Sequence, residues 1–141
     1  MSLPLIVALV FTVILLVITA YFLMGSVPLL VLKHDTPMDA RFVRGFFNTY
    51  YVAAMYAAGA TALSFLVAGW FVFAAGAAAL AAAAVVLRRS VMQTMDAIRA
   101  RLQAQDAVAI AAFRRTHLAA IGANLVQLAL IVWSLVALPL Q

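Results

Sequence analysis

The chain has 141 residues, of which 69% are hydrophobic and 9% charged, with a mean hydropathy of +1.17. Soluble domains are roughly half apolar, so this composition indicates one integral membrane domain over residues 1–141. The chain has no cysteine, which excludes disulfides, thiolate metal sites and cysteine nucleophiles. The net charge of +5 does not indicate a nucleic-acid partner, because in a membrane protein the positions of the charges matter more than their sum.

Four apolar stretches are each long enough to cross a bilayer, whose hydrocarbon core needs about 20 helical residues. The predicted spans are Leu3–Met24, Phe46–Leu66, Trp70–Leu87 and Leu118–Leu138. The first lacks a basic segment and is longer than the core of a signal peptide, so we expect a retained helix that ends or bends before Pro28. The second and third spans form one uncharged run, which should turn at Gly69.

The basic residues all lie in the two connections that share one side of this topology. The first connection contains Lys33, Arg41 and Arg44, and the second contains Arg88, Arg89, Arg99, Arg101, Arg114 and Arg115. The positive-inside rule therefore predicts that both connections are cytoplasmic and that both termini lie outside. A basic surface beside a membrane also suits anionic lipid headgroups.

The second connection is predicted to be a helical hairpin over residues 88–117 that extends the third and fourth helices into the cytoplasm. This segment has no glycine or proline before residue 117, and apolar residues recur at Met92, Met95 and Ile98, then at Val108 and Phe113. The break should fall at the sequence QAQD, residues 103–106. We expect the methionines between the two arms and the arginines outside.

Polar residues share one face on each of two spans when the helices are wound at about 100° per residue. On the fourth span this face carries His117, Asn124 and Gln127, and on the second it carries Arg41, Arg44, Asn48 and Tyr51. We expect the two faces to meet inside the bundle, with Leu118, Leu125 and Val132 facing lipid.

Two interpretations of these faces remain open. In the first, the amides and tyrosine hydroxyls form hydrogen bonds between helices and fix their register, each contributing about 0.6 to 2 kcal/mol. In the second, the two faces line a pocket, because ionisable groups inside a membrane bundle are functional candidates. The pocket would be lined by Arg44, Asn48, Tyr51, Arg115, His117, Asn124 and Gln127.

His117 is the candidate general base, since an imidazole titrates near neutral pH. His34 and His117 are the only pair that could clamp a haem iron, but His34 lies in a loop, and the sequence HDTPMD has no recognised metal-ligand spacing. We therefore expect no metal and no cofactor. No phosphate-binding loop or dinucleotide fingerprint is present, which disfavours ATP-driven chemistry.

Small residues on the third span suggest a contact between subunits. Gly76, Ala79 and Ala83 share one face, which would let another helix approach closely in a homo-oligomer or a larger membrane complex. Four short helices could form a transport pathway only as such an oligomer. No acidic residue lies within the four spans, which argues against a proton-coupled pump.

The sequence FRRTHLAAIGANLVQL, residues 113–128, together with the order of four spans and the arginine-bearing hairpin, resembles the anthrone-oxygenase-like group of small four-helix membrane proteins. Many members of that group are bacterial. The resemblance implies cofactor-independent oxidation of a polycyclic aromatic substrate. Its matching positions would be Arg115, His117, Asn124 and Gln127.

The sequence thus predicts an all-α four-helix transmembrane bundle in a bacterial inner membrane. Our leading hypothesis is that a polar pocket between the second and fourth helices binds, and oxidises or otherwise transforms, a lipophilic small molecule. Arg44 and Arg115 would face its polar end, Tyr51 and Asn124 would orient it, and His117 would act as base. The alternatives are a non-catalytic accessory subunit whose hairpin docks a partner or anionic lipid, and a small oligomeric transporter.

Overall fold

The computed structural model describes residues 2–31, 33, 36–102 and 106–137. Its elements are α1 (Leu3–Ser26), the short 3₁₀ helix η1 (Pro28–Val31), α2 (Pro37–Val67), α3 (Phe71–Leu102) and α4 (Ala107–Ala137). Over these described ranges all regular structure is helical. Each of the four α-helices is long and apolar enough to cross a membrane, which confirms the predicted all-α, four-helix membrane class.

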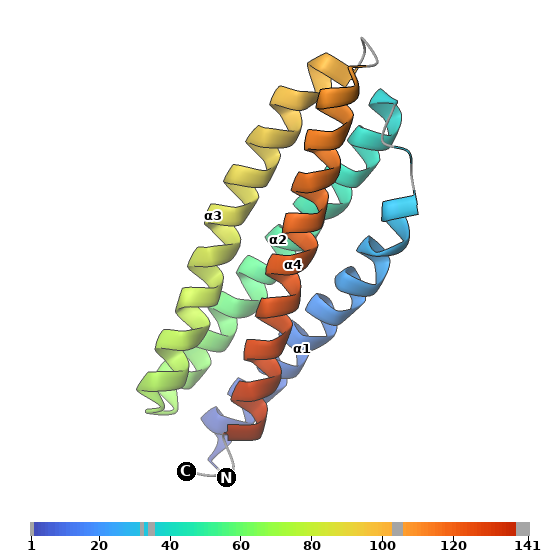
Figure 1. Ribbon diagram of the computed structural model, residues 1–141. Helices are drawn as coiled ribbons and strands as arrows, with labels where there is room; N and C mark the ends of the chain where they lie inside the picture. The colour runs from blue at the N-terminus through green and yellow to red at the C-terminus, as the bar shows by residue number, and fades with distance from the viewer. Residues whose placement is uncertain (1, 32, 34–35, 103–105, 138–141) are drawn as a thin grey trace.

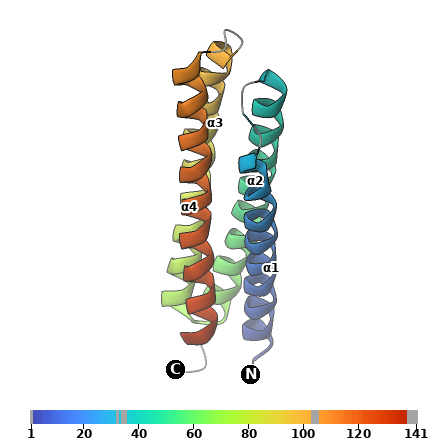
Figure 2. The ribbon, with the colours of Figure 1, turned by 45° about the vertical axis from the view of Figure 1, so that its right-hand side comes forward.

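The four helices form a ring in which each packs against two neighbours (Figures 1 and 2). The packed pairs are α1 with α2, α2 with α3, α3 with α4, and α4 with α1, so α2 lies diagonally opposite α4. One end of the bundle, here called the loop end, carries the α1–α2 and α3–α4 connections. The other, the terminal end, carries the start of α1, the end of α4 and the tight α2–α3 turn (Figure 1).

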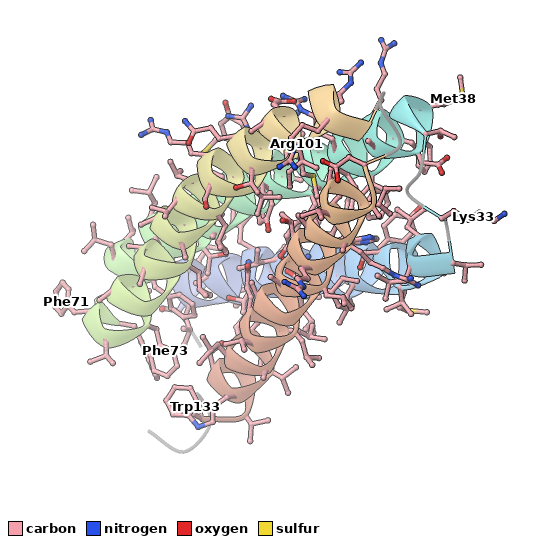
Figure 3. The ribbon with its side chains drawn as sticks, turned by 45° about the horizontal axis from the view of Figure 1, so that its top comes forward. Lys33, Met38, Phe71, Phe73, Arg101 and Trp133 are labelled. Carbon is pink, nitrogen blue, oxygen red and sulfur yellow. The ribbon has the colours of Figure 1, made fainter. Side chains whose placement is uncertain are left out.

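The basic side chains lie in one half of the bundle. All of them come from the loop half, which extends from the loop end, where Figure 3 shows Lys33 and Arg101, to Arg88 and Arg89 near the middle of α3. Phe71, Phe73 and Trp133 lie toward the terminal end. Large apolar side chains are exposed around the whole bundle, including Leu118, Leu125 and Val132 on α4, as predicted for a surface in contact with lipid. A water-soluble bundle would not expose so much apolar surface.

The ends of α1 and α2 depend on proline and a capping threonine. α1 ends at Ser26, before Pro28, as predicted. α2, however, begins at Pro37 rather than near Phe46, because Thr36 caps it: the Thr36 side chain accepts a hydrogen bond of 3.2 Å from the Asp39 backbone N–H. Part of the sequence HDTPMD is therefore a helix start, while His34 and Asp35 lie outside the described residues.

Asp106 stabilises the start of α4 and links it to the end of α3. Its carboxylate accepts the backbone N–H of Val108 at 2.9 Å and pairs with Arg101 at 2.6 Å. The Arg101 guanidinium, with help from the Val108 amide, holds the pKa of Asp106 below its usual range. Of the predicted break, residues 103–105 lie outside the described residues.

The methionines of α3 pack toward α4, as predicted. Met92, Met95 and Phe113 are buried in a single apolar cluster. Val108, another apolar position of the segment, is mostly exposed, because the buried face of the first turn of α4 carries Ala109 instead. An apolar residue at helical spacing therefore does not by itself identify the packed face.

Gly69 should tolerate replacement poorly because of its backbone conformation. It forms the α2–α3 turn with a φ of +79°, a conformation that costs other residues about 1 to 2 kcal/mol. We expect Gly69→Ala to lower the free energy of unfolding in mixed detergent micelles by that amount. Gly122→Ala is the matched control, because an added methyl group meets open space within helix α4, so this variant should be neutral or up to ~1 kcal/mol more stable. Equal effects of the two substitutions would contradict the role given to the turn.

Candidate functional site

The polar face of α4 is turned into the bundle. His117, Asn124 and Gln127 are all buried, together with Ala120 and Ile131 from the same face. This confirms the prediction that these residues share one face of the fourth helix and that this face, with its amides, is turned away from lipid.

The polar face of α2 is turned elsewhere, mostly toward α3. The Arg44 guanidinium pairs with the Asp96 carboxylate through contacts of 2.5 and 2.7 Å, and Arg88 Nε donates to Asn48 Oδ1 at 2.9 Å. Asp96 and Arg88 both belong to α3, the neighbour of α2 in the ring. The expectation that Arg44 and Asn48 face α4 is therefore wrong, because α4 lies on the diagonal and α3 supplies the nearer partners.

Aromatic rings connect α2 and α4 at the centre of the bundle. The His117 and Phe47 rings lie edge to face with their centroids 5.3 Å apart, and Phe47 in turn contacts Tyr51 at 6.2 Å. Tyr50 packs against Tyr51 at 5.2 Å. α2 and α4 run in the same direction, so the tyrosines on α2 and Asn124 on α4 both lie beyond this ring contact, toward the terminal end. We call Tyr50, Tyr51, His117, Asn124 and Gln127 the polar core.

Tyr51, Asn124 and Gln127 have buried polar atoms without a hydrogen bond in the described part of the chain. Among the described residues, no partner lies within hydrogen-bonding geometry of either polar atom of the Asn124 amide, of Gln127 Nε2 or of the Tyr51 hydroxyl. A buried amide without a partner costs about 1 to 3 kcal/mol in proteins. Of the three amides in the predicted faces, only Asn48 makes a bond between helices in the described part of the chain. The interpretation of Asn124 as a register-fixing contact therefore gains no support from the geometry.

An apolar cavity lies away from the predicted pocket. It is a cleft of about 470 Å³ between α3 and α4 in the terminal half of the bundle, and its floor comes from α1 and α2. Its apolar walls include Phe65, Phe73, Leu80, Ile131 and Trp133. Figure 3 shows Phe73 and Trp133 projecting into the space between α3 and α4.

Two kinds of residue give the cleft its shape and its few polar atoms. Gly76, Ala79 and Ala83, expected above as a contact between subunits, line its α3 wall, where their small size leaves space. Thr12, Thr61 and Ser134 supply hydroxyl groups, each of which donates to a carbonyl of its own helix at 2.7 to 2.9 Å. Their oxygen lone pairs remain able to accept hydrogen bonds.

The predicted site residues are not brought together in one pocket. Arg115 is exposed and Arg44 is engaged at the α2–α3 surface, both toward the loop end. Tyr51, His117, Asn124 and Gln127 form the interior polar core, and no predicted site residue lines the cleft. The small residues on α3 are the feature of the sequence that coincides with the cleft. Their role in a contact between subunits stays a prediction.

The haem and metal expectations stay predictions. His34 lies outside the described residues, so its position relative to His117 is not part of this structure. Within the described residues, no three His, Asp or Glu side chains gather as a metal site.

Fold and site define this chain as a four-helix protein whose helices are long and apolar enough to cross a membrane, with a buried polar core and a lateral apolar cleft. Comparison with protein-family models, with curated proteins and with solved structures gave no match. The resemblance of residues 113–128 to the anthrone-oxygenase-like group therefore remains an expectation.

Proposed function

We propose that this protein binds a lipophilic small molecule within the membrane, with the apolar body of that molecule in the cleft between α3 and α4. The observation that carries the proposal is a cleft one helical turn from the buried Gln127 side chain, whose amide nitrogen has no hydrogen-bond partner among the described residues. Its volume of about 470 Å³ falls in the range of small-molecule sites, roughly 300 to 1,000 Å³. Apolar walls with a few polar atoms are also typical of such sites.

The arrangement along α4 suggests how such a molecule would be oriented. Ile131 lines the cleft, and Gln127 lies one helical turn away on the same face, a rise of about 6 Å. A ligand with one polar end directed toward Gln127, and with its body against Phe73 and Trp133, would match both the polar amide and the apolar wall of the cleft. The expected class is therefore an amphiphile that is mostly apolar.

The proposal concerns binding, and a catalytic role for His117 is a separate prediction. His117 lies seven residues before Asn124, about 10 Å along the helix axis, against the ring of Phe47. It lines no part of the cleft. Oxidation or another transformation would require the substrate to reach this deeper position, so the two roles can be tested independently.

For the orientation, we propose that the loop end faces the cytoplasm of a bacterial inner membrane. All of the lysines and arginines in the sequence lie in the loop half of the bundle, and the terminal half has none. The positive-inside rule supports this direction. In this orientation the cleft opens to lipid in the outer half of the membrane.

Filling the cleft tests the function directly. We expect Ala79→Leu, which adds a large side chain to the cleft wall, to lower the affinity for an added lipophilic probe, anthrone, by roughly ten-fold or more. Binding can be followed by quenching of Trp133 fluorescence in a Trp70→Phe background. Native mass spectrometry of the wild-type protein in mild detergent should also show a copurified small molecule that the variant lacks.

Ala78→Leu is the matched control, because Ala78 is exposed on the same helix but does not line the cleft. It should bind anthrone as the wild type does. Equal binding by both variants would contradict the proposal. So would conversion of a dimer to a monomer by Ala79→Leu alone, which would assign the small residues to a subunit contact.

A further inference from the structure

A second groove, here called the furrow, runs between α1 and α2 in the loop half of the bundle. It has a volume of about 590 Å³ and lies on a different pair of helices from the cleft. Exposed side chains form its sides, among them Tyr21, Met38 and Phe42, so it opens toward the surrounding lipid. It is lined by Tyr21, Phe22, Met38, Arg41, Phe42, Gly45, Phe46 and Thr49.

The furrow exists because of one aromatic contact and one glycine. Phe22 of α1 packs on Phe46 of α2 with ring centroids 4.9 Å apart, and the Phe46 ring comes so close to Gly25 that an added Cβ would lie 2.8 Å from it. On the neighbouring face, a Cβ at Gly45 would meet nothing within 4 Å. The rings therefore close the floor of the furrow, while Gly45 leaves its centre open.

Arg41 marks the loop end of this furrow and carries a charge that no described side chain neutralises. The ion pairs of the described residues are Arg44 with Asp96 and Arg101 with Asp106. Asp39 is two residues from Arg41, a spacing at which side chains do not face each other on a helix. Lys33, exposed at the same end, adds a second positive charge (Figure 3).

The dimensions match one half of a bilayer. From Arg41 to Thr49 the α2 wall rises about 12 Å, close to the ~15 Å depth of one leaflet's hydrocarbon region. A guanidinium presents a fork of N–H donors that suits phosphate oxygens. The furrow is an apolar, aromatic groove of this length, and it ends at a guanidinium with no ion-pair partner among the described residues. These two features match the acyl chain and the phosphate of a phospholipid.

We propose that the furrow is a binding site for an anionic phospholipid, with its phosphate at Arg41 and one acyl chain along Phe22, Phe42 and Phe46. The excess of positive charge selects a headgroup with net negative charge over a zwitterionic one. This site is distinct from the cleft, since the two share no lining residue and the furrow lies toward the opposite end of the bundle.

The test is native mass spectrometry of the full-length protein in detergent, with phosphatidylglycerol or phosphatidylcholine of identical acyl chains added. The wild type should bind phosphatidylglycerol more tightly. Arg41→Gln should weaken that binding about five-fold, the equivalent of ~1 kcal/mol for one basic residue near a membrane surface. Arg89→Gln is the matched control, because Arg89 is exposed on α3 outside the furrow.

Gly45→Leu provides a second variant, which fills the furrow but leaves Arg41 in place. It should weaken phosphatidylglycerol binding as well, whereas anthrone binding in the cleft should not change. Equal affinity for the two lipids, or equal losses in Arg41→Gln and Arg89→Gln, would overturn the proposal and leave only a general attraction of basic residues to the membrane surface.

Discussion

Phe47→Ala should lower the free energy of unfolding by about 3 kcal/mol or more. Phe47 is fully buried at the centre of the bundle and contacts the rings of Phe46, Tyr51 and His117. It joins α2 to α4 across the diagonal, where the backbones are too far apart to pack directly. Neither lipid nor the surrounding side chains can readily fill the resulting void, so the cost should approach that of cavities in other tightly packed cores.

The measurement is unfolding in mixed detergent micelles, followed by circular dichroism. Phe71→Ala is the matched control, since Phe71 is an exposed phenylalanine at the start of α3 that points away from the bundle (Figure 3). It should change the stability by less than about 0.5 kcal/mol, as do most surface substitutions. If both variants lost the same stability, the Phe47–His117 contact would not be the link between α2 and α4 that the geometry indicates.

The sequence was sufficient to predict α4 in detail because its two faces differ so strongly. Asn124 and Gln127 recur at the helical period among large apolar residues, and no spanning helix can turn such amides to lipid cheaply. Leu118 and Leu125 fall on the opposite face and are exposed, as predicted. The free energy of these amides differs by several kcal/mol between lipid and the interior of the bundle, so only one orientation of α4 is favourable.

The same reasoning gave the wrong neighbour for Arg44 and Asn48 of α2. A helical period shows which residues share a face, but not which neighbouring helix that face meets. Arg44 and Asn48 do share a face with Tyr51. Their partners are chosen by the ring order of the helices, which places Asp96 and Arg88 of α3 within reach. That order depends on packing between whole helices, and no local pattern in the sequence determines it.

Two further features, the start of α2 and the cleft beside α3, have a recognisable pattern in the sequence that also fits another interpretation. The first is the start of α2 at Thr36, Pro37 and Asp39. A threonine followed by proline, with an acidic residue three positions after the threonine, is typical of a helix N-terminus. The small residues of α3 signalled a surface that something else could approach closely. Whether that surface is a cleft or a subunit contact depends on the distance between α3 and α4, which is a tertiary property.

Asn124→Leu should leave the free energy of unfolding unchanged or raise it by about 1 to 2 kcal/mol, although it replaces a buried polar residue. The two side chains are close in size, so little space is lost or gained. No described residue hydrogen-bonds the Asn124 amide, and its removal therefore relieves a buried group that has no partner. The same reasoning applies to the Gln127 nitrogen, so Gln127→Leu should behave similarly.

Asn48→Leu is the control, because this substitution should change the stability in the opposite direction. The Asn48 amide accepts a hydrogen bond from Arg88, so its loss leaves a partly buried guanidinium without that acceptor, and the stability should fall by about 1 to 3 kcal/mol. A loss of similar size for Asn124→Leu would show that its amide fixes helix register, as the first interpretation of the polar faces requires. Stability that is maintained in Asn124→Leu and Gln127→Leu, combined with weaker anthrone binding, would instead mean that the protein retains these amides for a ligand, since they contribute nothing to the stability of the bundle without one.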